Sequence, residues 1–157
     1  MIRELSAISA GLTTSVTAYT SGDQVGNVFS FPGAVDVAGG RGIVLDAKII
    51  DAADVMGACE LCLFSALPVA AADNAPEAFS DADELLSEGR LSFATTDMFD
   101  SANNRVINYS GAVGRGFKCA ATTLFATLTT RSANSFFVAV TDLTVILTIN
   151  TGTYGIV

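Results

Sequence analysis

Short segments in which apolar and polar residues alternate dominate this chain, and they constrain its fold more than any other feature. In residues 143–149, aliphatic side chains occupy every second position, at Leu143, Val145, Leu147 and Ile149. A period of two is typical of a strand that buries one face. On this pattern and on β-forming composition, we predict strands over 12–19, 28–31, 43–50, 59–64, 91–95, 105–109, 123–130 and 143–149.

Turn signals that contain glycine separate these segments, at 21–23, 39–42, 110–111, 114–116 and 151–152. Many short strands with frequent turns predict an all-β fold, an antiparallel β-sandwich that is either jelly-roll-like or immunoglobulin-like. We interpret 39–42 as a hairpin turn, because it lacks the lysine and the following helix of a phosphate-binding loop. We expect a single β-sandwich domain over 1–157, in which 1–11 can extend as an arm.

One segment departs from the strand pattern. In 77–89, Ser80 or Asp81 can cap a short helix, acidic residues follow in its first turn, and Gly89 can end it. We therefore predict one short helical insertion near 80–88, in a long connection between strands.

The composition argues against catalysis. The chain has no histidine and no tryptophan, and histidine is the side chain that most often performs acid and base catalysis near neutral pH. We expect a protein that is not an enzyme and that needs no cofactor.

The charge balance narrows the range of partners. Sixteen acidic and eight basic residues give a net charge of −8. This excess of negative charge disfavours binding to nucleic acid and to anionic membranes. The most apolar stretch, 61–72, is interrupted by Pro68 and is shorter than a membrane span. No export signal is recognisable at the start.

The three cysteines are Cys59, Cys62 and Cys119. Cys59 and Cys62 have the spacing of redox and zinc motifs, but no second pair follows, and strand alternation points the two thiols to opposite faces. We expect three free packing cysteines in a chain made in a reducing cytoplasm.

Two groups of carboxylates are candidates for binding or catalysis. The first could bind Ca²⁺ but lacks the spacing of an EF-hand, so a solvated and capped loop is favoured; it comprises Asp73, Glu77, Asp81, Asp83, Glu84 and Glu88. The second could contain a pair for glycoside hydrolysis, although ordinary surface carboxylates are commoner; it comprises Asp46, Asp51, Asp54, Asp97 and Asp100. We predict no metal site from either group.

A resemblance covers most of the first two thirds of the chain. The stretches 17–35, 40–68 and 73–86 resemble a group of small structural proteins of tailed bacteriophages. The matching residues are Tyr19, Gly22, Asp23, Val25 and Gly26, then Gly42, Asp51, Leu63, Phe64 and Pro68, then Asp73, Asn74, Pro76, Ser80, Asp81, Ala82 and Asp83. The resemblance implies a capsid decoration (cement) protein on the outside of the phage head. It also implies a homotrimer that binds the major capsid protein, made in the host cytoplasm and located on the virion.

Two sets of residues are hypotheses for binding. The candidate capsid-binding arm runs from the N-terminus to about Tyr19 and includes Ile2, Arg3, Leu5, Ile8 and Leu12; the candidate oligomer interface is Phe136, Phe137 and Val138. A core strand over 136–140 is at least as well supported as an interface.

Two other functions stay open at this point. One is a β module of a phage tail, collar or fibre, which would have few copies per particle. The other, less favoured, is a carbohydrate-binding or hydrolytic jelly roll that uses Asp and Glu.

Overall fold

The computed structural model describes residues 5–101, 103–111, 114–133, 137 and 139–151. Nearly all of its regular structure is β. The elements in chain order are β1 (Leu5–Leu12), β2 (Gln24–Phe31), β3 (Arg41–Asp51), β4 (Cys59–Phe64), α1 (Asp81–Glu84), β5 (Ser87–Phe93), the 3-10 turn η1 (Thr95–Asp97), β6 (Met98–Ser101), β7 (Asn104–Asn108), β8 (Arg115–Lys118), β9 (Leu124–Thr130) and β10 (Leu143–Asn150).

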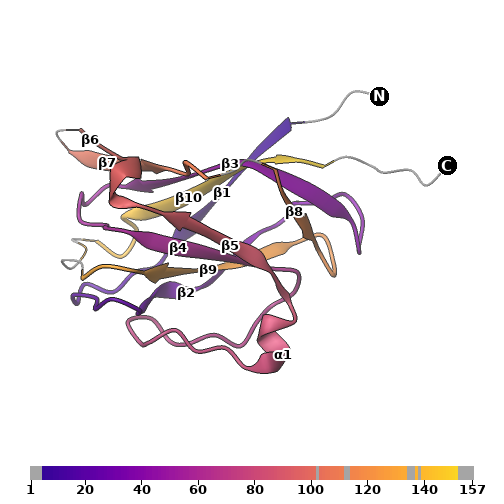
Figure 1. Cartoon of the computed structure of the whole chain (residues 1–157), viewed down its shortest axis with the longest axis horizontal. Helices are drawn as coiled ribbons and strands as arrows, with labels where there is room; N and C mark the ends of the chain where they lie inside the picture. The colour runs from indigo at the N-terminus through magenta and orange to yellow at the C-terminus, as the bar shows by residue number, and fades with distance from the viewer. Residues whose placement is uncertain (1–4, 102, 112–113, 134–136, 138, 152–157) are drawn as a thin grey trace.

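The strands form two antiparallel sheets packed face to face (Figure 1). The six-stranded sheet has the order β1-β10-β3-β7-β6, with β8 also paired to β3, and the four-stranded sheet has the order β2-β9-β4-β5. This confirms the predicted antiparallel β-sandwich.

The pairing pattern identifies the type of sandwich. Strand β1 pairs with β10, β2 with β9, β3 with β7 and β8, and β4 with β5. Early strands therefore pair with late strands, as in a long hairpin that has been wrapped into two sheets. This is the jelly-roll arrangement, with β7 and β8 together taking one strand position beside β3.

The core lies between the sheets and is built from the inward faces of the strands. The predicted inward face of β10 is fully buried, at Leu143, Val145, Leu147 and Ile149. Connecting loops close one end, where Phe137 packs edge-to-face on Tyr19 with 5.8 Å between ring centroids. Burial of these apolar faces supplies the main stabilising free energy of such a sandwich.

The predicted strands over 28–31, 43–50, 59–64, 91–95, 105–109, 123–130 and 143–149 all fall within or largely overlap observed strands. The prediction of a strand over 12–19 is wrong: β1 ends at Leu12, and residues 13–18 form a loop. This loop curls around one phenol, because the Ser15 N–H donates to Tyr19 Oη at 2.7 Å.

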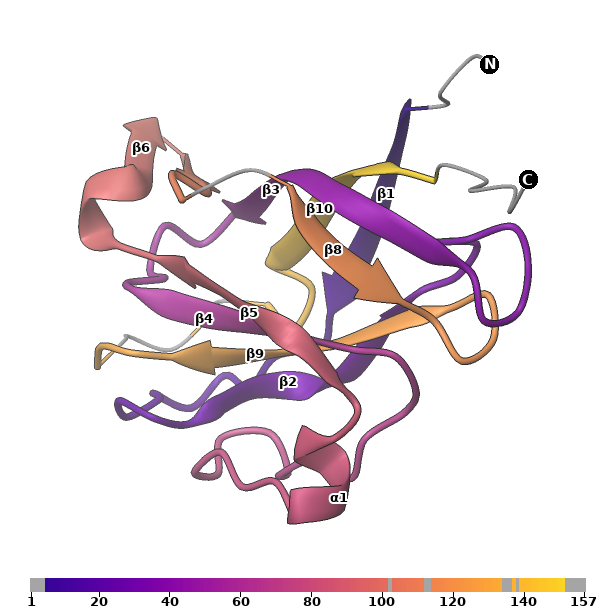
Figure 2. The ribbon, with the colours of Figure 1, turned by 45° about the vertical axis from the view of Figure 1, so that its right-hand side comes forward.

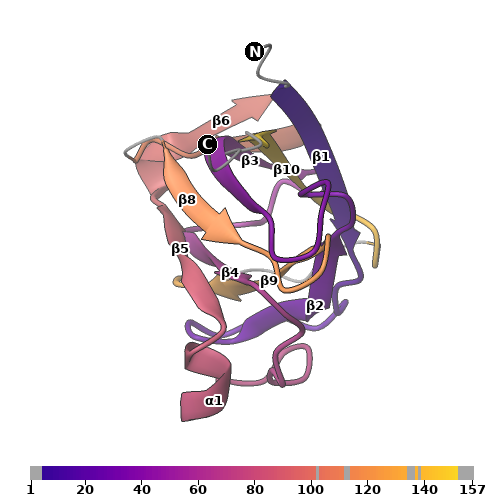
Figure 3. The ribbon, with the colours of Figure 1, turned by 90° about the vertical axis from the view of Figure 1, so that its right-hand side faces the viewer.

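The N-terminal segment is also different from the expected arm. Residues 5–12 pair with β10 along their whole length, and Ile8 and Ala10 pack against the core. Residues 5–11 are therefore an edge strand of the six-stranded sheet, and Figure 3 shows β1 along that edge. Residues 1–4 lie outside the described residues.

The interpretation of 39–42 as a hairpin turn is wrong. The connection that contains it leads from β2 in one sheet to β3 in the other. Gly39 has φ +75°, which supports a turn at this point, but the turn joins the two sheets instead of two paired strands.

The predicted helical insertion is confirmed but is shorter than 80–88. Helix α1 spans Asp81–Glu84, and its N-cap is Ser80, whose side chain accepts a hydrogen bond from the Asp83 N–H. The chain enters β5 at Ser87, so Gly89, with φ +118°, lies in a strand and does not end the helix. None of the helices among the described residues has the length and apolar character that a bilayer crossing requires.

Candidate functional site

A grid of polar side chains covers the outer face of the four-stranded sheet. The row Gln24, Thr129, Glu60 and Ser92 crosses all four strands in register. A neighbouring row contains Thr127, Cys62 and Arg90. Directly opposed residues of paired strands point to the same face, so these seven side chains share one surface. We call them the polar grid.

Residues 65–86, which connect β4 to β5 and include α1, lie along the outer side of this sheet near β2 (Figure 2). We call them the covering segment. Beneath it Gln24, Thr127 and Thr129 are almost completely buried, although they face away from the core.

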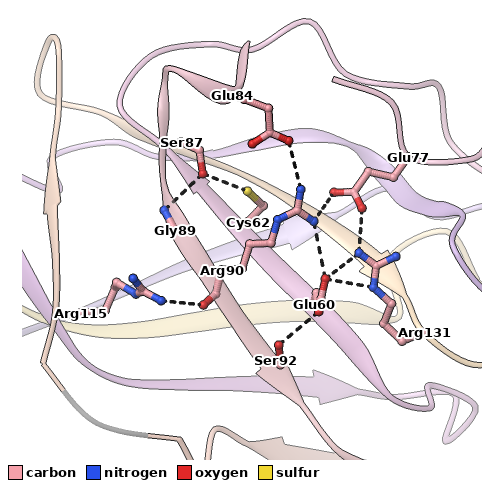
Figure 4. Close-up of polar contacts among 10 residues, drawn as sticks. All are labelled: Glu60, Cys62, Glu77, Glu84, Ser87, Gly89, Arg90, Ser92, Arg115 and Arg131. Atoms are coloured by element: carbon pink, nitrogen blue, oxygen red, sulfur yellow. Dashed lines mark hydrogen bonds and ion pairs between the residues drawn. The ribbon is translucent and has the colours of Figure 1, made fainter. Parts of the chain in front are cut away.

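Ion pairs tie the covering segment to the grid (Figure 4). Arg90 of β5 lies 2.8 Å from Glu77, 3.3 Å from Glu84 and 3.5 Å from Glu60. Arg131, just after β9, lies 2.6 Å from Glu60 and 2.8 Å from Glu77. Each guanidinium therefore links the sheet to the segment above it.

The electrostatics of this network favour the charged forms. Burial acts to raise the pKa of Glu60, but hydrogen bonds and positive charge from Arg131, with smaller contributions from Ser92 and Arg90, hold that pKa below its ordinary value. Burial acts to lower the pKa of Arg90, but Glu77, together with Cys62 and Glu84, holds that pKa above its ordinary value. A general acid at neutral pH needs a raised carboxyl pKa, so Glu60 is better suited to holding the segment than to proton transfer.

The covering segment also extends the sheet at the outer edge of β2. The Gln24 N–H donates to the Ala75 carbonyl at 2.8 Å, and the Asn74 N–H donates to the Gln24 carbonyl at 2.9 Å. A further bond runs from the Glu77 N–H to the Gly22 carbonyl at 2.9 Å. These bonds satisfy backbone groups that an edge strand would otherwise present to other chains.

The Asp73 carboxylate also joins the covering segment to β2 and to the loop before it. Asp73 Oδ1 accepts a hydrogen bond from Tyr19 Oη at 2.6 Å and another from the Gly26 N–H at 2.7 Å. Burial and the bond to Asp73 raise the pKa of Tyr19, so the phenol stays a hydrogen-bond donor. The two motif stretches that carry the phage resemblance, near 19–26 and 73–83, thus lie together and have a structural role.

A second carboxylate anchors α1. Asp83 accepts hydrogen bonds from Ser80 Oγ at 2.6 Å and from the Val69 N–H at 2.8 Å. The Ser80 hydroxyl, followed by the Val69 amide, holds the pKa of Asp83 below its ordinary value. Glu88, another member of the first acidic group, accepts a hydrogen bond from the Lys118 N–H at 3.1 Å.

The cysteines behave as predicted. All three are free and buried. Cys59 belongs to the core cluster, whereas the Cys62 sulfur lies 3.6 Å from Ser87 Oγ on the outer side of the sheet. Burial raises the pKa of Cys119 to about 11 and also raises those of the other two thiols. All three thiols are thus unsuited to nucleophilic attack at neutral pH.

The second group of carboxylates lies in part around one guanidinium, that of Arg105. Asp51 is buried and accepts N–H bonds from Ala53, Val55 and Met56, which shapes the turn after β3. Asp54 and Asp100 pair with Arg105 at 3.1 and 2.6 Å. Within the described residues, no group of three or more acidic or cysteine side chains is placed to hold a metal ion.

The residues predicted for capsid binding lie on β1. Leu5 is exposed, Ile8 is half-buried, and Leu12 is buried at the end of the strand. Ile2 and Arg3 lie outside the described residues.

Of the residues predicted for an oligomer interface, Phe137 is completely buried against Tyr19, so it serves the core of its own chain. Its burial agrees with the core alternative given for this segment. Phe136 and Val138 lie outside the described residues.

Sequence reasoning missed an uncharged row of residues on the outer face of the six-stranded sheet. Neither β1 nor β10 contains a charged residue. A row of outward positions crosses this sheet through Gly11, Thr144, Ile50, Val106 and Phe99. Phe99 is 68% exposed. On the same face, Lys48 and Asp46 of β3 are opposed to Ile146 and Thr148 of β10. The uncharged part of this face therefore follows β1, β10 and the row that ends at Phe99.

Comparisons with known proteins close the description of the site. No protein-family model and no curated protein matches the chain. Among solved structures, it is similar to VP2 of infectious bursal disease virus in a subviral particle, with a TM-score of 0.31, 9% identity, and coverage of 96% of this chain and 42% of that chain. It is also similar to a mutant VP2 of the same virus in T=1 particles, with a TM-score of 0.24, 12% identity, and coverage of 94% and 39%. The chain thus spans less than half the length of either neighbour, and both neighbours are viral proteins in particles.

Proposed function

We propose that this chain is a non-enzymatic virion structural protein, a cement protein that binds the outside of a phage head and bridges major capsid protein subunits. In this proposal it acts as a homotrimer, without cofactor, nucleic acid or membrane. Jelly rolls serve in viral capsids and in lectins, so the fold alone does not select this function. The observation that carries the proposal is the edge strand β1.

Strand β1 differs from the other sheet edges. Its eight residues contain no charge and no proline, and among the described residues it pairs only with β10. By contrast, the covering segment bonds to the start of β2, at Gln24, and the guanidinium of Arg115 donates to the Arg90 carbonyl at the edge of β5. Edge β6 is only four residues long and contains Asp100. Charge, shortness and coverage are the usual protections of an edge strand, and β1 has none of them.

An unprotected edge is suited to binding an extended strand of another protein. Backbone hydrogen bonds supply affinity in such strand addition, and alternate side chains supply specificity. The uncharged strands β1 and β10 add outer surface that a partner can cover without burying an unpaired charge. If each trimer presents three such edges, the contacts act together and raise the effective concentration of the binding sites.

The first test is the number of copies of the chain in purified particles of its source, measured by quantitative mass spectrometry against the major capsid protein. A cement protein is expected at an abundance comparable to that of the capsid protein. A small fraction would instead indicate a tail, collar or fibre module, and absence from the particles would refute a virion role.

The second test addresses β1 directly. Ser9 is exposed in the middle of β1, and Ser9→Lys adds the kind of charge that blocks strand addition. We expect particle occupancy to fall roughly tenfold or more, which corresponds to about 1.4 kcal/mol. Leu85→Lys is the matched control, because Leu85 is 86% exposed on the opposite side of the sandwich. Equal occupancy of the two variants, both with unchanged melting temperature, would exclude β1 as the binding edge.

A further inference from the structure

The polar grid contains three buried atoms that no described group satisfies. They are Gln24 Oε1, Thr127 Oγ1 and Thr129 Oγ1, and none has a hydrogen-bond partner. The three residues are at most 1% exposed. A buried polar group without a partner costs free energy comparable to a lost hydrogen bond, and buried polar groups in native proteins are normally satisfied by protein or by ordered water.

The three atoms are close to one another by strand geometry. Gln24 and Thr129 are directly opposed across β2 and β9, which places their Cβ atoms about 5 Å apart. Thr127 and Thr129 are two residues apart on β9, a separation of about 6.6 Å. The two hydroxyls do not bond to each other, and one water molecule between two hydroxyls spans up to about 5.6 Å.

The hydrogen-bonding needs of the three unsatisfied atoms indicate which kind of ligand can bind them. The Gln24 amide nitrogen already donates to the Gly26 carbonyl at 3.1 Å, so Oε1 needs a donor. Each threonine hydroxyl can donate or accept. The neighbouring carboxylates Glu60 and Glu77 are already bonded to Arg131. Two guanidiniums nearby disfavour a cation, and the three unsatisfied atoms carry no charge.

We propose that the polar grid is a binding site for ordered water, held between the four-stranded sheet and the covering segment. One molecule bridges Thr127 Oγ1 and Thr129 Oγ1, and water donates to Gln24 Oε1. The covering segment is therefore attached by ion pairs, by backbone hydrogen bonds to β2, by the Phe79 ring on Phe64, and by water beneath it. Buried water of this kind forms about three hydrogen bonds and is part of the structure.

A crystal structure of the unaltered chain at about 1.5 Å resolution is the direct test. We expect density at hydrogen-bond distance, about 2.6–3.2 Å, from both threonine hydroxyls. Hydroxyls that donate to protein carbonyls with no density between them would overturn the proposal. So would density with five or more short oxygen contacts, which would indicate a metal ion.

Isosteric variants give an independent test. Thr127→Val and Thr129→Val keep the side-chain shape and remove one hydroxyl each. If water bridges them, each variant lowers the melting temperature by about 2–5 °C, and the double variant loses less than the sum because both hydroxyls share the water. The control is Thr148→Val, at a half-exposed position on the outer face of the other sheet. An unchanged or raised melting temperature in both grid variants would show that the hydroxyls bind no water.

Discussion

At the scale of single residues, Gly42 shows how the lack of a side chain allows two strands to pack. Gly42 of β3 is directly opposed to Phe117 of β8. A Cβ added at Gly42 would lie 2.5 Å from Phe117 Cζ and 2.7 Å from Cε1. The Phe117 ring is itself buried, so it cannot move aside without disturbing the core. Gly42 therefore provides the space that the Phe117 ring occupies.

The prediction is that Gly42→Ala destabilises the fold by about 1–3 kcal/mol, which is typical of overpacking. Gly116→Ala is the control, because Gly116 also lies in the β3–β8 pair and has open space around its Cβ position. Urea denaturation measures both. A loss in Gly116→Ala as large as that in Gly42→Ala would mean that strand propensity, and not the Phe117 ring, limits this position.

Asp73 has a different role, since one of its oxygens satisfies two donors from a distant part of the chain. We expect Asp73→Ala to lower the free energy of unfolding by about 1.5–3 kcal/mol, because Tyr19 Oη and the Gly26 N–H lose a charged acceptor. Asp36→Ala, at an exposed position, should change it by less than about 0.5 kcal/mol.

A double-mutant cycle separates the Tyr19 contact from the rest. Combined with Tyr19→Phe, the loss caused by Asp73→Ala should be smaller than in the unaltered chain, since the shared bond is counted once. Strict additivity in chemical denaturation would show that the Tyr19 to Asp73 bond contributes nothing measurable.

At the scale of elements, the success of prediction followed the strength of the local pattern. Strand β10 was predicted because its aliphatic residues alternate regularly and all face the core. Strand β1 was missed because small residues such as Ser6, Ala7 and Gly11 give it little apolar contrast, and pairing with β10 determines its conformation. Long-range pairing of this kind leaves little trace in local sequence.

The candidate site was predictable only in part. The cap at Ser80 follows from local spacing and is one of the two predicted caps, whereas the reciprocal bond from Asp83 is not predicted. The ion network was not, because Glu60, Arg90 and Arg131 come from three different strands or strand ends, and only the strand order brings them together. A regular alternation of residue types predicts a face, but not which charges will meet on it.

The carboxylates that hold the covering segment make the free energy of unfolding depend on pH. Glu60 and Asp83 both have a pKa below the ordinary value in the folded protein. A depressed carboxyl pKa contributes stability that is present above the unfolded pKa and is lost as pH falls through the folded pKa. We therefore expect the free energy of unfolding to fall as pH decreases below about 4.5, the ordinary value for Glu60.

Urea denaturation between pH 3 and pH 7 measures this dependence. In Glu60→Gln the curve should be flatter over the acid range and lower at pH 7, whereas Asp36→Asn should leave it unchanged. Hydrogen exchange of the Asn74 and Glu77 amides, which hold the segment to β2, should accelerate first. A Glu60→Gln curve parallel to that of the unaltered chain would show that Glu60 does not contribute to the pH dependence of the free energy of unfolding.

At the scale of the whole molecule, β1 is an edge strand without charge, proline or a covering segment among the described residues. Most of the expected arm at 1–11 belongs to strand β1. Its removal therefore affects the stability of the fold as well as binding. Deleting residues 2–11 takes away most of β1 and uncovers the edge of β10, including the half-buried contact of Ile8.

We expect this deletion to lower the free energy of unfolding by more than about 2 kcal/mol, since burial of one Leu or Ile side chain contributes about 1.5–3 kcal/mol. Thermal unfolding followed by circular dichroism measures the loss. A truncated chain as stable as the full chain would mean that β1 behaves as a detachable arm after all.

The position of β10 also has a consequence for how the chain reaches this structure. Strand β10 lies between β1 and β3, so these two early strands cannot join into one sheet until residues near the C-terminal end have been synthesised. On the ribosome, β1 and the neighbouring edge of β3 remain unpaired while more than 90 residues between β3 and β10 are added. Such non-local pairing slows folding and leaves strand edges exposed to other chains. Rapid synthesis of many copies would therefore place the greatest demand on chaperones at the stage before β10 is released.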